Sequence, residues 1–399
     1  MTEQIAISNV QAPPDLSVVT LDFVIQVPVV FDLDVQLQLL VEDSGEELYS
    51  IHIRQAGWDV AWLPAGEYRI QVRPEFGALM DTDCLLRAAV WSNANGKAEL
   101  ESSHELSLFV DPRRPAPILR RPDWQMSCAT PGLDLKNLSW NLGHDNWFFS
   151  HFDHAARVVI QLMFDNSPRL KGKILDVGCG DGITDLGIFL RCQPELLVGI
   201  DPFRGYRRLP EIAKANFLPD DWQSDARLRF EPADGNNIPY DDDNFDVVLS
   251  WGSLEHIAGG YQATLDEIRR VLKPGGLLFA HPGLFYGPKG NHLGEFFDDP
   301  WIHLKLGEEE LRQRVLSSTP NYLDRAGEFA SPEQYWQWYT ELNRITVSDF
   351  EQRVRSLGFQ PWRAALRTAN VVEYTDQLQQ YSIADLCTGE LYASFVLDN

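Results

Sequence analysis

The sequence predicts two domains of different fold class, an all-β sandwich over residues 1–111 and an α/β domain over residues 124–399. Three observations lead to this prediction. A chain of 399 residues is longer than one ordinary hydrophobic core supports. Apolar residues alternate with a period of two in the first quarter of the chain. Beyond a proline- and arginine-rich segment, short apolar runs alternate with helical patterns, which is typical of a parallel sheet covered on both faces.

The composition excludes several classes of protein. The formal net charge is −24, which argues against nucleic acid as a partner because phosphate backbones are bound by basic surfaces. The first ten residues lack the basic and apolar regions of an export signal, and no run approaches the roughly 18 apolar residues of a membrane span. The five cysteines show no metal-binding or disulfide spacing. We therefore expect a cytoplasmic protein without a membrane span.

The first domain is predicted to contain about seven short antiparallel strands. In Glu67–Arg73, Tyr68, Ile70 and Val72 share one face and polar residues share the other. Similar alternation and the intervening turn residues place the strands near 18–27, 35–41, 48–54, 60–63, 68–73, 84–91 and 105–110.

One hairpin of this domain carries a recognisable pattern. Leu63-x-x-Gly66-x-Tyr68 resembles a motif of immunoglobulin-like sandwiches, in particular the carbohydrate-binding domains of bacterial polysaccharide ABC transporters. The resemblance implies carbohydrate binding, for which Trp58, Trp62 and Trp91 are candidates. Packing within the domain is the competing role for each tryptophan.

Residues 112–123 form the predicted linker, because they contain four prolines and four arginines and such a segment is stiff and extended. In the second domain, helices are expected near 186–191, 210–217, 264–272 and 348–357, with strands at 174–177, 196–200, 228–231, 245–251, 277–280 and 392–396. Thr264 and Glu267 have the spacing of a helix capping box.

A glycine-rich turn follows the first of these strands. Gly178, Gly180 and Gly182 stand between the strand and a helix, where a ligand can approach bare backbone and the N–H groups of the helix N-terminus. A dinucleotide fold would need a glycine at position 183, which is Ile183. The pattern, with Asp176 two residues before the first glycine, resembles motif I of the class I S-adenosyl-L-methionine (SAM) methyltransferases.

The resemblance continues in order through residues 170–280, along Asp201-Pro202, Ala233–Gly235, Ile238–Val248, Ser250–His256 and Leu272–Gly276. It implies a Rossmann-like domain with a seven-stranded sheet and SAM as cofactor. Asp201 would accept hydrogen bonds from both ribose hydroxyls, and Asp234 would contact the adenine amine. The implied cofactor-binding residues are Asp176, Gly178, Cys179, Gly180, Gly182, Asp201, Pro202, Asp234, Gly235, Ser250 and Trp251.

Methyl transfer to a hydroxyl requires removal of a proton, so histidines near the carboxyl ends of the strands are candidate bases. His256 follows the fourth strand of the methyltransferase pattern and His281 follows the fifth. A role in shaping the pocket is the alternative for His256.

Residues 283–304 form a glycine- and proline-broken insertion with many aromatic residues, which predicts a lid or binding loop. Its pattern Gly-x-His-Leu followed by Pro-Trp-x-His-Leu resembles bacterial methyltransferases of glycan and secondary-metabolite pathways. Candidate substrate residues are Tyr286, His292, Trp301 and His303. These side chains would otherwise pack the lid in place. No metal site is predicted, because the spacing of His292, Asp298, Asp299 and His303 is not diagnostic.

The sequence thus predicts a SAM-dependent methyltransferase that acts on a hydroxyl or amine of a sugar, glycan or secondary metabolite. A SAM- or carbohydrate-binding protein without turnover is the alternative.

Overall fold

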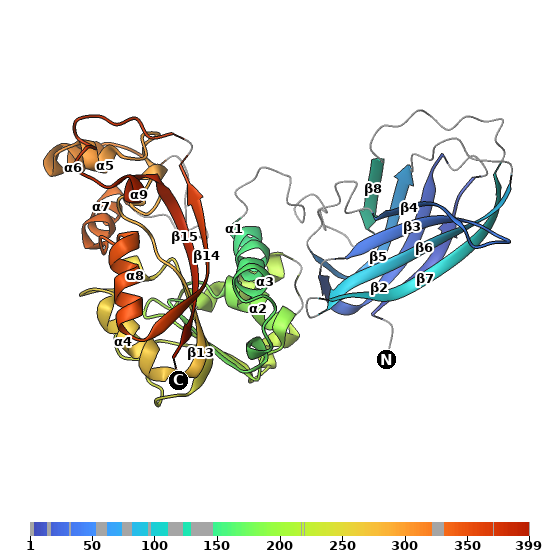
Figure 1. The fold of residues 1–399 in the computed structure, drawn as a ribbon, viewed down its shortest axis with the longest axis horizontal. Coiled ribbons are helices and arrows are strands. Elements are labelled where there is room, and N and C mark those ends of the chain that lie inside the picture. Colours follow the sequence, from blue (N-terminus) through green and yellow to red (C-terminus); the bar gives the residue numbers. More distant parts are fainter. Residues whose placement is uncertain are drawn as a thin grey trace. The chain divides into compact units, whose positions relative to one another are not determined.

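The computed structural model describes residues 4–13, 17–31, 33–52, 62–73, 82–94, 97–110, 123–128, 147–216, 218, 220–320, 331–369 and 371–398. The chain divides into two compact units, an all-β unit that contains β1–β8 and an α/β unit that begins at Trp147 (Figure 1). The predicted linker at 112–123 lies almost wholly outside the described residues, as does Trp58.

The first unit contains two four-stranded antiparallel sheets, with strand orders β1-β2-β5-β8 and β4-β3-β6-β7. This arrangement is consistent with the predicted sandwich. The strands are β1 (Ile5–Gln11), β2 (Val19–Phe31), β3 (Asp34–Val41), β4 (Glu47–His52), β5 (Trp62–Arg73), β6 (Thr82–Ala94), β7 (Lys97–Val110) and β8 (Asp123–Cys128).

Two strand predictions for this unit were wrong. The segments 60–63 and 68–73, which the sequence separates by a turn, belong to the single strand β5. The longer β2 accommodates this, because its register shifts between Ile25 and Val29 opposite Gly66 and Pro64. The sequence analysis also missed β1 and β8. β8 pairs with β5, with Tyr68 opposite Cys128.

Tyr68 occupies a defined position in β5. Its ring is buried, and its hydroxyl donates a 2.7 Å hydrogen bond to the carbonyl of Pro64. Such a bond, from a buried tyrosine to the backbone a few residues upstream, is a feature of immunoglobulin-like sandwiches. Burial raises the pKa of Tyr68 further above its usual range, so the hydroxyl stays a donor.

The second unit is built on a mixed seven-stranded sheet of order β11-β10-β9-β12-β13-β15-β14. β9 through β13 are parallel to one another, and β15 is antiparallel to both neighbours. The strands are β9 (Lys173–Val177), β10 (Leu196–Ile200), β11 (Leu228–Glu231), β12 (Phe245–Trp251), β13 (Leu272–His281), β14 (Phe359–Thr368) and β15 (Thr388–Leu397). The predicted Rossmann-like sheet is confirmed, although β14 was not expected.

Helices cover both faces of this sheet, with α1, α2 and α3 on one side and α4 and α8 on the other (Figure 1). The helices are α1 (Trp147–Phe149), α2 (Ile183–Cys192), α3 (Leu209–Ala215), α4 (Gln262–Val271), α5 (Ile302–Lys305), α6 (Glu308–Leu316), α7 (Pro332–Glu341), α8 (Val347–Ser356) and α9 (Ile383–Cys387). The central strands are almost wholly apolar because both of their faces are buried, as in Ile174–Val177.

The order of the sheet reverses at β9, which pairs with β10 on one side and β12 on the other. The connections from β9 and β12 therefore leave in opposite directions, which opens a crevice at the carboxyl ends of these strands. The glycine turn follows β9 and the Ser250–His256 loop follows β12, so both border this crevice.

The insertion predicted at 283–304 is the first part of a larger element between β13 and α8. Leu293, Phe296 and Ile302 pack with Leu311 of α6 and Tyr335 of α7 in one buried cluster. The insertion is therefore anchored by two further helices.

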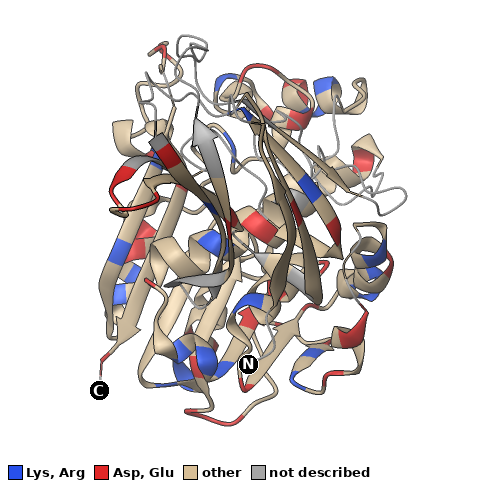
Figure 2. Ribbon diagram, turned by 90° about the vertical axis from the view of Figure 1, so that its right-hand side faces the viewer, with Lys and Arg blue, Asp and Glu red and all other residues tan. Residues whose placement is uncertain are grey.

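In the part of the chain that is described, no helix combines the length and apolar character needed to cross a bilayer. Lys and Arg are interspersed with Asp and Glu along the described ribbon in the view of Figure 2.

Candidate cofactor and acceptor site

The glycine turn after β9 leaves one of its glycines open to a ligand. Gly178, Gly180 and Gly182 all have positive φ, at 82°, 55° and 75°. A Cβ at Gly178 would lie 2.2 Å from the Cβ of Ser253, and one at Gly182 would lie 2.7 Å from the ring of Phe230. A Cβ at Gly180 would meet no atom within 4 Å. Gly178 and Gly182 are thus required by packing, and Gly180 presents its backbone to a ligand.

Hydrogen bonds hold this turn in a fixed shape. The backbone N–H groups of Gly178 and Cys179 donate to the carbonyl of Ile200, at 2.9 and 3.1 Å. The Asp181 carboxylate accepts from Ile183 N at 3.1 Å and from the indole nitrogen of Trp147 at 2.7 Å. Hydrogen bonds within the protein therefore hold the backbone of the glycine turn in place.

Asp201, at the end of β10, lies beside the open glycine. One carboxylate oxygen accepts a hydrogen bond from Phe203 N at 2.7 Å, and the other accepts from Gly180 N at 3.2 Å. Burial raises the pKa of Asp201, and its backbone N–H donors act in the opposite direction. Pro202 is exposed, and the ring of Phe203 is 88% exposed. A carboxylate, a bare backbone and an uncovered ring thus share one edge of the turn.

Asp176 lies behind the turn and forms a buried pair with Asp185 of α2. The two residues are 4% and 0% exposed. Burial raises the pKa of Asp176 to about 7 and that of Asp185 well above its usual range, and the nearby Asp176 carboxylate raises the pKa of Asp185 further. Two adjacent buried carboxyls do not both ionise, so we infer that the pair holds a proton at neutral pH.

The loop after β11 reaches the same crevice. Asp234 is exposed, and its carboxylate accepts a hydrogen bond from Asn236 N at 2.9 Å. Gly235 is buried, and a Cβ there would lie 3.0 Å from Thr264 and 3.1 Å from Val177. Thr264 does not cap α4 as expected, because its hydroxyl donates to the Asn236 side chain at 2.7 Å.

The loop after β12 is tied to the end of β9. Ser250 is fully buried, and its hydroxyl lies 2.7 Å from that of Ser253. Ser253 in turn donates to the carbonyl of Val177 at 2.7 Å. These bonds fix the residues that follow, including Glu255 and His256, relative to the glycine turn.

Trp251 and His281 occupy paired positions at the ends of β12 and β13. The centroids of their rings are 4.8 Å apart, and the His281 ring is edge-on to Tyr392 at 4.5 Å. Burial lowers the pKa of His281, and the negative charge of Glu255 acts in the opposite direction. A neutral imidazole retains one nitrogen that can accept a proton.

Glu255 brings together two histidines from distant parts of the sequence. The ring centroids of His256 and His292 are 4.9 Å apart, and His292 Nε2 is 3.8 Å from a carboxylate oxygen of Glu255. Glu255 is 2% exposed. Burial opposes its ionisation, yet the two neighbouring histidines and the backbone N–H of Gly283 lower the pKa of Glu255 to about 2. Glu255 is therefore a buried anion at neutral pH.

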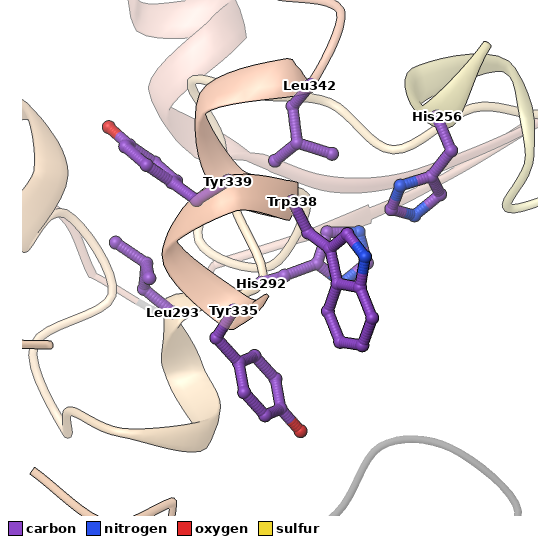
Figure 3. Close-up of a pocket in the computed structure, with 7 residues that line it drawn as sticks. All are labelled: His256, His292, Leu293, Tyr335, Trp338, Tyr339 and Leu342. Carbon is purple, nitrogen blue, oxygen red and sulfur yellow. The ribbon is translucent and has the colours of Figure 1, made fainter. Parts of the chain in front are cut away.

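These two histidines line a pocket that α7 closes on one side (Figure 3). His256 and His292 both lie on the side of the pocket where the indole of Trp338 projects. The remaining lining residues are Leu293, Tyr335, Tyr339 and Leu342. The pocket thus combines two imidazoles with an aromatic wall.

Comparison with known proteins shows which family the segment that forms this crevice resembles. Residues 175–280 match the family model of the methyltransferase domain. This segment is a SAM-dependent methyltransferase domain. The predicted enzyme class and the predicted cofactor are thereby confirmed at the level of the domain.

The methyltransferase domain has relatives of several specificities. The chain is 30% identical over 155 residues to a 27-O-demethylrifamycin SV methyltransferase of Amycolatopsis mediterranei, which covers 36% of this chain and 53% of the relative. It is 31% identical over 134 residues to a fatty-acid O-methyltransferase of Mycolicibacterium smegmatis, which covers 32% of this chain and 44% of the relative. The chain therefore spans about half the length of these relatives or less.

A solved structure with a similar fold is a putative S-adenosylmethionine dependent methyltransferase from Listeria monocytogenes. The TM-score is 0.38 at 14% identity, with 62% of this chain and 99% of that chain covered.

The crevice of the methyltransferase domain fits SAM. Gly180 offers open backbone, the Asp201 carboxylate stands beside it, and the exposed ring of Phe203 is available to cover an adenine. Of the predicted cofactor residues, the structure gathers the glycine turn, Asp201-Pro202, Asp234-Gly235 and Ser250-Trp251 around the carboxyl ends of β9–β12. Their contacts with the cofactor stay predictions.

Three of the four predicted acceptor residues do not line the pocket, and they pack in a buried cluster that adjoins it through Tyr339 and Leu342. His303 Nε2 hydrogen-bonds the carbonyl of Phe285 at 2.9 Å, and burial lowers the pKa of His303 to about 4. Trp301 is 7% exposed, and the ring of Tyr286 lies 5.4 Å from that of Tyr381. These contacts favour a packing role, and only His292 reaches the pocket.

The sequence analysis missed several residues of the methyltransferase domain. Glu255 was not predicted as a site residue, although it directly precedes His256. Phe203 was not predicted either, although it directly follows Asp201-Pro202. The aromatic wall was also missed, although its residues 335, 338, 339 and 342 have the spacing of one helix face. That spacing was the sequence signal from which this helix face could have been predicted.

Proposed function

We propose that the whole chain is a methyltransferase that moves the methyl group of SAM to a hydroxyl or amine of a small molecule. The observation that carries this proposal is the pocket lined by His292 of the insertion and by His256, whose loop Ser253 ties to the end of β9. An acceptor in this pocket would lie next to the crevice that fits the cofactor.

The chain's own residues would bind, orient and deprotonate the acceptor. The sulfonium of bound SAM supplies an activated methyl group. His256 and His281 are the proposed proton acceptors, because Glu255 stabilises a protonated imidazole beside it and burial keeps His281 neutral. Alignment of the acceptor by the pocket wall would supply a large part of the rate enhancement.

We propose a sugar, a glycan end or a secondary metabolite as the acceptor. Tyr335, Trp338 and Tyr339 provide ring faces for a flat or saturated ring of such a molecule. Two relatives are named for small-molecule acceptors, 27-O-demethylrifamycin SV and fatty acids.

The first unit is proposed to bind the carbohydrate part of such an acceptor. Its two antiparallel sheets and the Tyr68–Pro64 hydrogen bond support the resemblance to immunoglobulin-like domains. Trp62 is 1% exposed and therefore has no surface for a sugar ring, which leaves Trp91 among the described candidates. We keep the linker at 112–123 as a proposal, but β8 follows it and pairs with β5, so we propose that the first domain extends beyond the linker to include β8.

A cytoplasmic location is proposed as well. The described residues include all five cysteines and show no disulfide between them, as is common in a reducing compartment.

Incubation of the protein with methyl-labelled SAM and pools of nucleotide sugars, glycans and secondary metabolites tests the activity. We expect label to enter at least one pool, and to be lost with Asp201→Ala. SAM binding without transfer to any pool would instead support a SAM- or carbohydrate-binding protein without turnover.

A further inference from the structure

Glu255, His256 and His292 form a cluster whose chemistry goes beyond acid–base catalysis. Each residue offers one ligand atom, and the three atoms all lie within 4.8 Å of one another. Nitrogen and oxygen ligands bind a first-row metal at about 2.0–2.2 Å, so two ligands of one ion are at most about 4.3 Å apart. Small side-chain rotations would bring the three atoms to that separation.

Two of these ligand groups have unsatisfied polar atoms. Glu255 is 2% exposed, and its Oε2 has no hydrogen-bond partner among the described residues. His292 Nε2 is likewise buried without a hydrogen-bond partner there, and it lies 3.8 Å from the other carboxylate oxygen. A buried polar atom without a hydrogen-bond partner is costly. A bound cation would satisfy both groups at once.

The backbone around the cluster is held firmly. His292 has a left-handed φ of 57°, which is uncommon for a residue other than glycine. The Asn291 side chain fixes it by donating to the carbonyls of Gly287 and Pro300, at 3.1 and 3.2 Å, and by accepting from Leu293 N at 3.0 Å. Strain of this kind persists where surrounding structure enforces it, and it gathers at functional sites.

The loop that carries the other two proposed ligands, Glu255 and His256, is held by Asn343. Asn343 N donates to the carbonyl of Glu255 at 2.7 Å, and the Asn343 amide donates to the carbonyls of Leu254 and Ile257, at 2.8 and 3.0 Å. Two asparagines thus position two chain segments that are 36 residues apart in sequence so that their side chains converge.

We propose that Glu255, His256 and His292 bind a divalent first-row transition metal such as Mn²⁺, Fe²⁺, Co²⁺ or Zn²⁺. Two imidazoles and one carboxylate are the donor set that such ions prefer over Mg²⁺ or Ca²⁺. Three protein ligands leave coordination positions free, and the pocket supplies the space beside them. This proposal differs from the expectation of no metal site, which considered His292 only with Asp298, Asp299 and His303. In the structure, Asp299 pairs with Lys305 at 2.9 Å and His303 with Phe285.

The role of the metal rests on the proposed function. The free positions would take an acceptor oxygen, or two neighbouring oxygens of a diol, and the bound cation would lower the pKa of that hydroxyl. His256 and His292 would then be ligands, and His281 would remain as the proposed acceptor of the hydroxyl proton.

Titration of the full chain with Co²⁺ and Zn²⁺ after removal of metal by a chelator tests the site. We expect about one ion per chain and a visible Co²⁺ absorption band. Glu255→Gln and His292→Ala should each weaken binding at least about 100-fold. Asp298→Asn, an exposed acid of the same insertion, is the matched control and should bind as the unchanged chain does.

The outcomes separate this proposal from the proposed function. SAM affinity, measured on the same variants, shows whether each variant is folded. Absence of Co²⁺ or Zn²⁺ binding up to millimolar concentration, or unchanged binding in both ligand variants, would overturn the metal site. Full methyl transfer in excess chelator would also overturn its role, and the methyltransferase proposal would still hold. Loss of SAM binding in the unchanged chain would contradict the methyltransferase proposal.

Discussion

At the scale of single residues, Asp201 is the most informative position of the cofactor site. Its carboxylate lies at the open glycine and would accept from two ribose hydroxyls. We expect Asp201→Ala to weaken SAM binding by about 1–3 kcal/mol, the cost of unpaired polar groups. Calorimetric titration measures this, with Glu211→Gln on the exposed side of α3 as control. Unchanged affinity in Asp201→Ala would contradict the assignment.

The glycines of the turn make a second test. Both Gly180→Ala and Gly182→Ala place a side chain at positive φ, which costs about 1–2 kcal/mol of stability. Gly182→Ala also meets the ring of Phe230, so we expect its melting temperature to fall further. Gly180→Ala should keep the fold and lose at least about tenfold in SAM affinity, because its methyl group occupies ligand space. Equal SAM affinity in Gly180→Ala and the unchanged chain would argue against this ligand position.

The buried pair of Asp176 and Asp185 predicts a pH dependence of stability. The folded chain retains a proton that the unfolded chain releases above about pH 4. The free energy of unfolding therefore falls as pH rises from about 4 through the folded pKa of about 7 for Asp176. Asp185→Asn removes this ionisation and should stabilise the chain by about 1–3 kcal/mol at pH 8. Urea unfolding at pH 5 and pH 8 checks this prediction. If the free energies of unfolding of Asp185→Asn and the unchanged chain differed by the same amount at both pH values, the result would be inconsistent with a shared proton.

The grouping of residues at the site was predictable from the sequence where neighbouring strands carry the whole group. The turn from Gly178 to Gly182 and Asp201 follow consecutive strands, so strand order alone brings them together. The cluster of Glu255 and His292 was not predictable, because it depends on the path of an insertion. The same path carries Trp301 and His303 into a packed interior instead.

At the scale of elements, α7 determines the shape of the acceptor pocket. Ser331 and Gln334 form a reciprocal capping box at its start, and Tyr335 anchors the helix in the core of the insertion. Trp338 is half-buried and lines the pocket.

We therefore expect Trp338→Ala to raise the KM for the acceptor several-fold and to leave the Kd for SAM unchanged. Steady-state kinetics with a turned-over acceptor, together with SAM titration, measure the two effects. Gln337→Ala, on the exposed face of the same helix, is the control. A change in SAM affinity alone would place the acceptor elsewhere.

Element boundaries show why local signals fail. Thr264 and Glu267 have the capping-box spacing, but both turn toward the loop after β11, where Glu267 accepts from Ile238 N at 2.9 Å. Pro64 and Gly66 read as a turn, yet β5 continues through them because β2 shifts register opposite. Contacts between distant segments outweighed the local preference in both cases.

At the scale of the whole molecule, the two units are proposed to divide acceptor binding and chemistry. Because β8 completes a sheet of the first unit and the second unit begins at Trp147, a chain that begins at Trp147 removes every strand of the first unit. We expect this truncated chain to bind SAM as before and to lose activity on a polymeric glycan more than on a small acceptor. Equal activity of both chains on every acceptor would leave the first unit without a role in acceptor binding.

The most direct test of the central claim is a crystal structure with S-adenosylhomocysteine. We predict that the ribose hydroxyls meet Asp201, that the backbone at Gly180 contacts the ligand, and that the sulfur faces the pocket of His256 and His292. A ligand bound outside the crevice of β9 and β12, or a sulfur turned away from that pocket, would contradict the account.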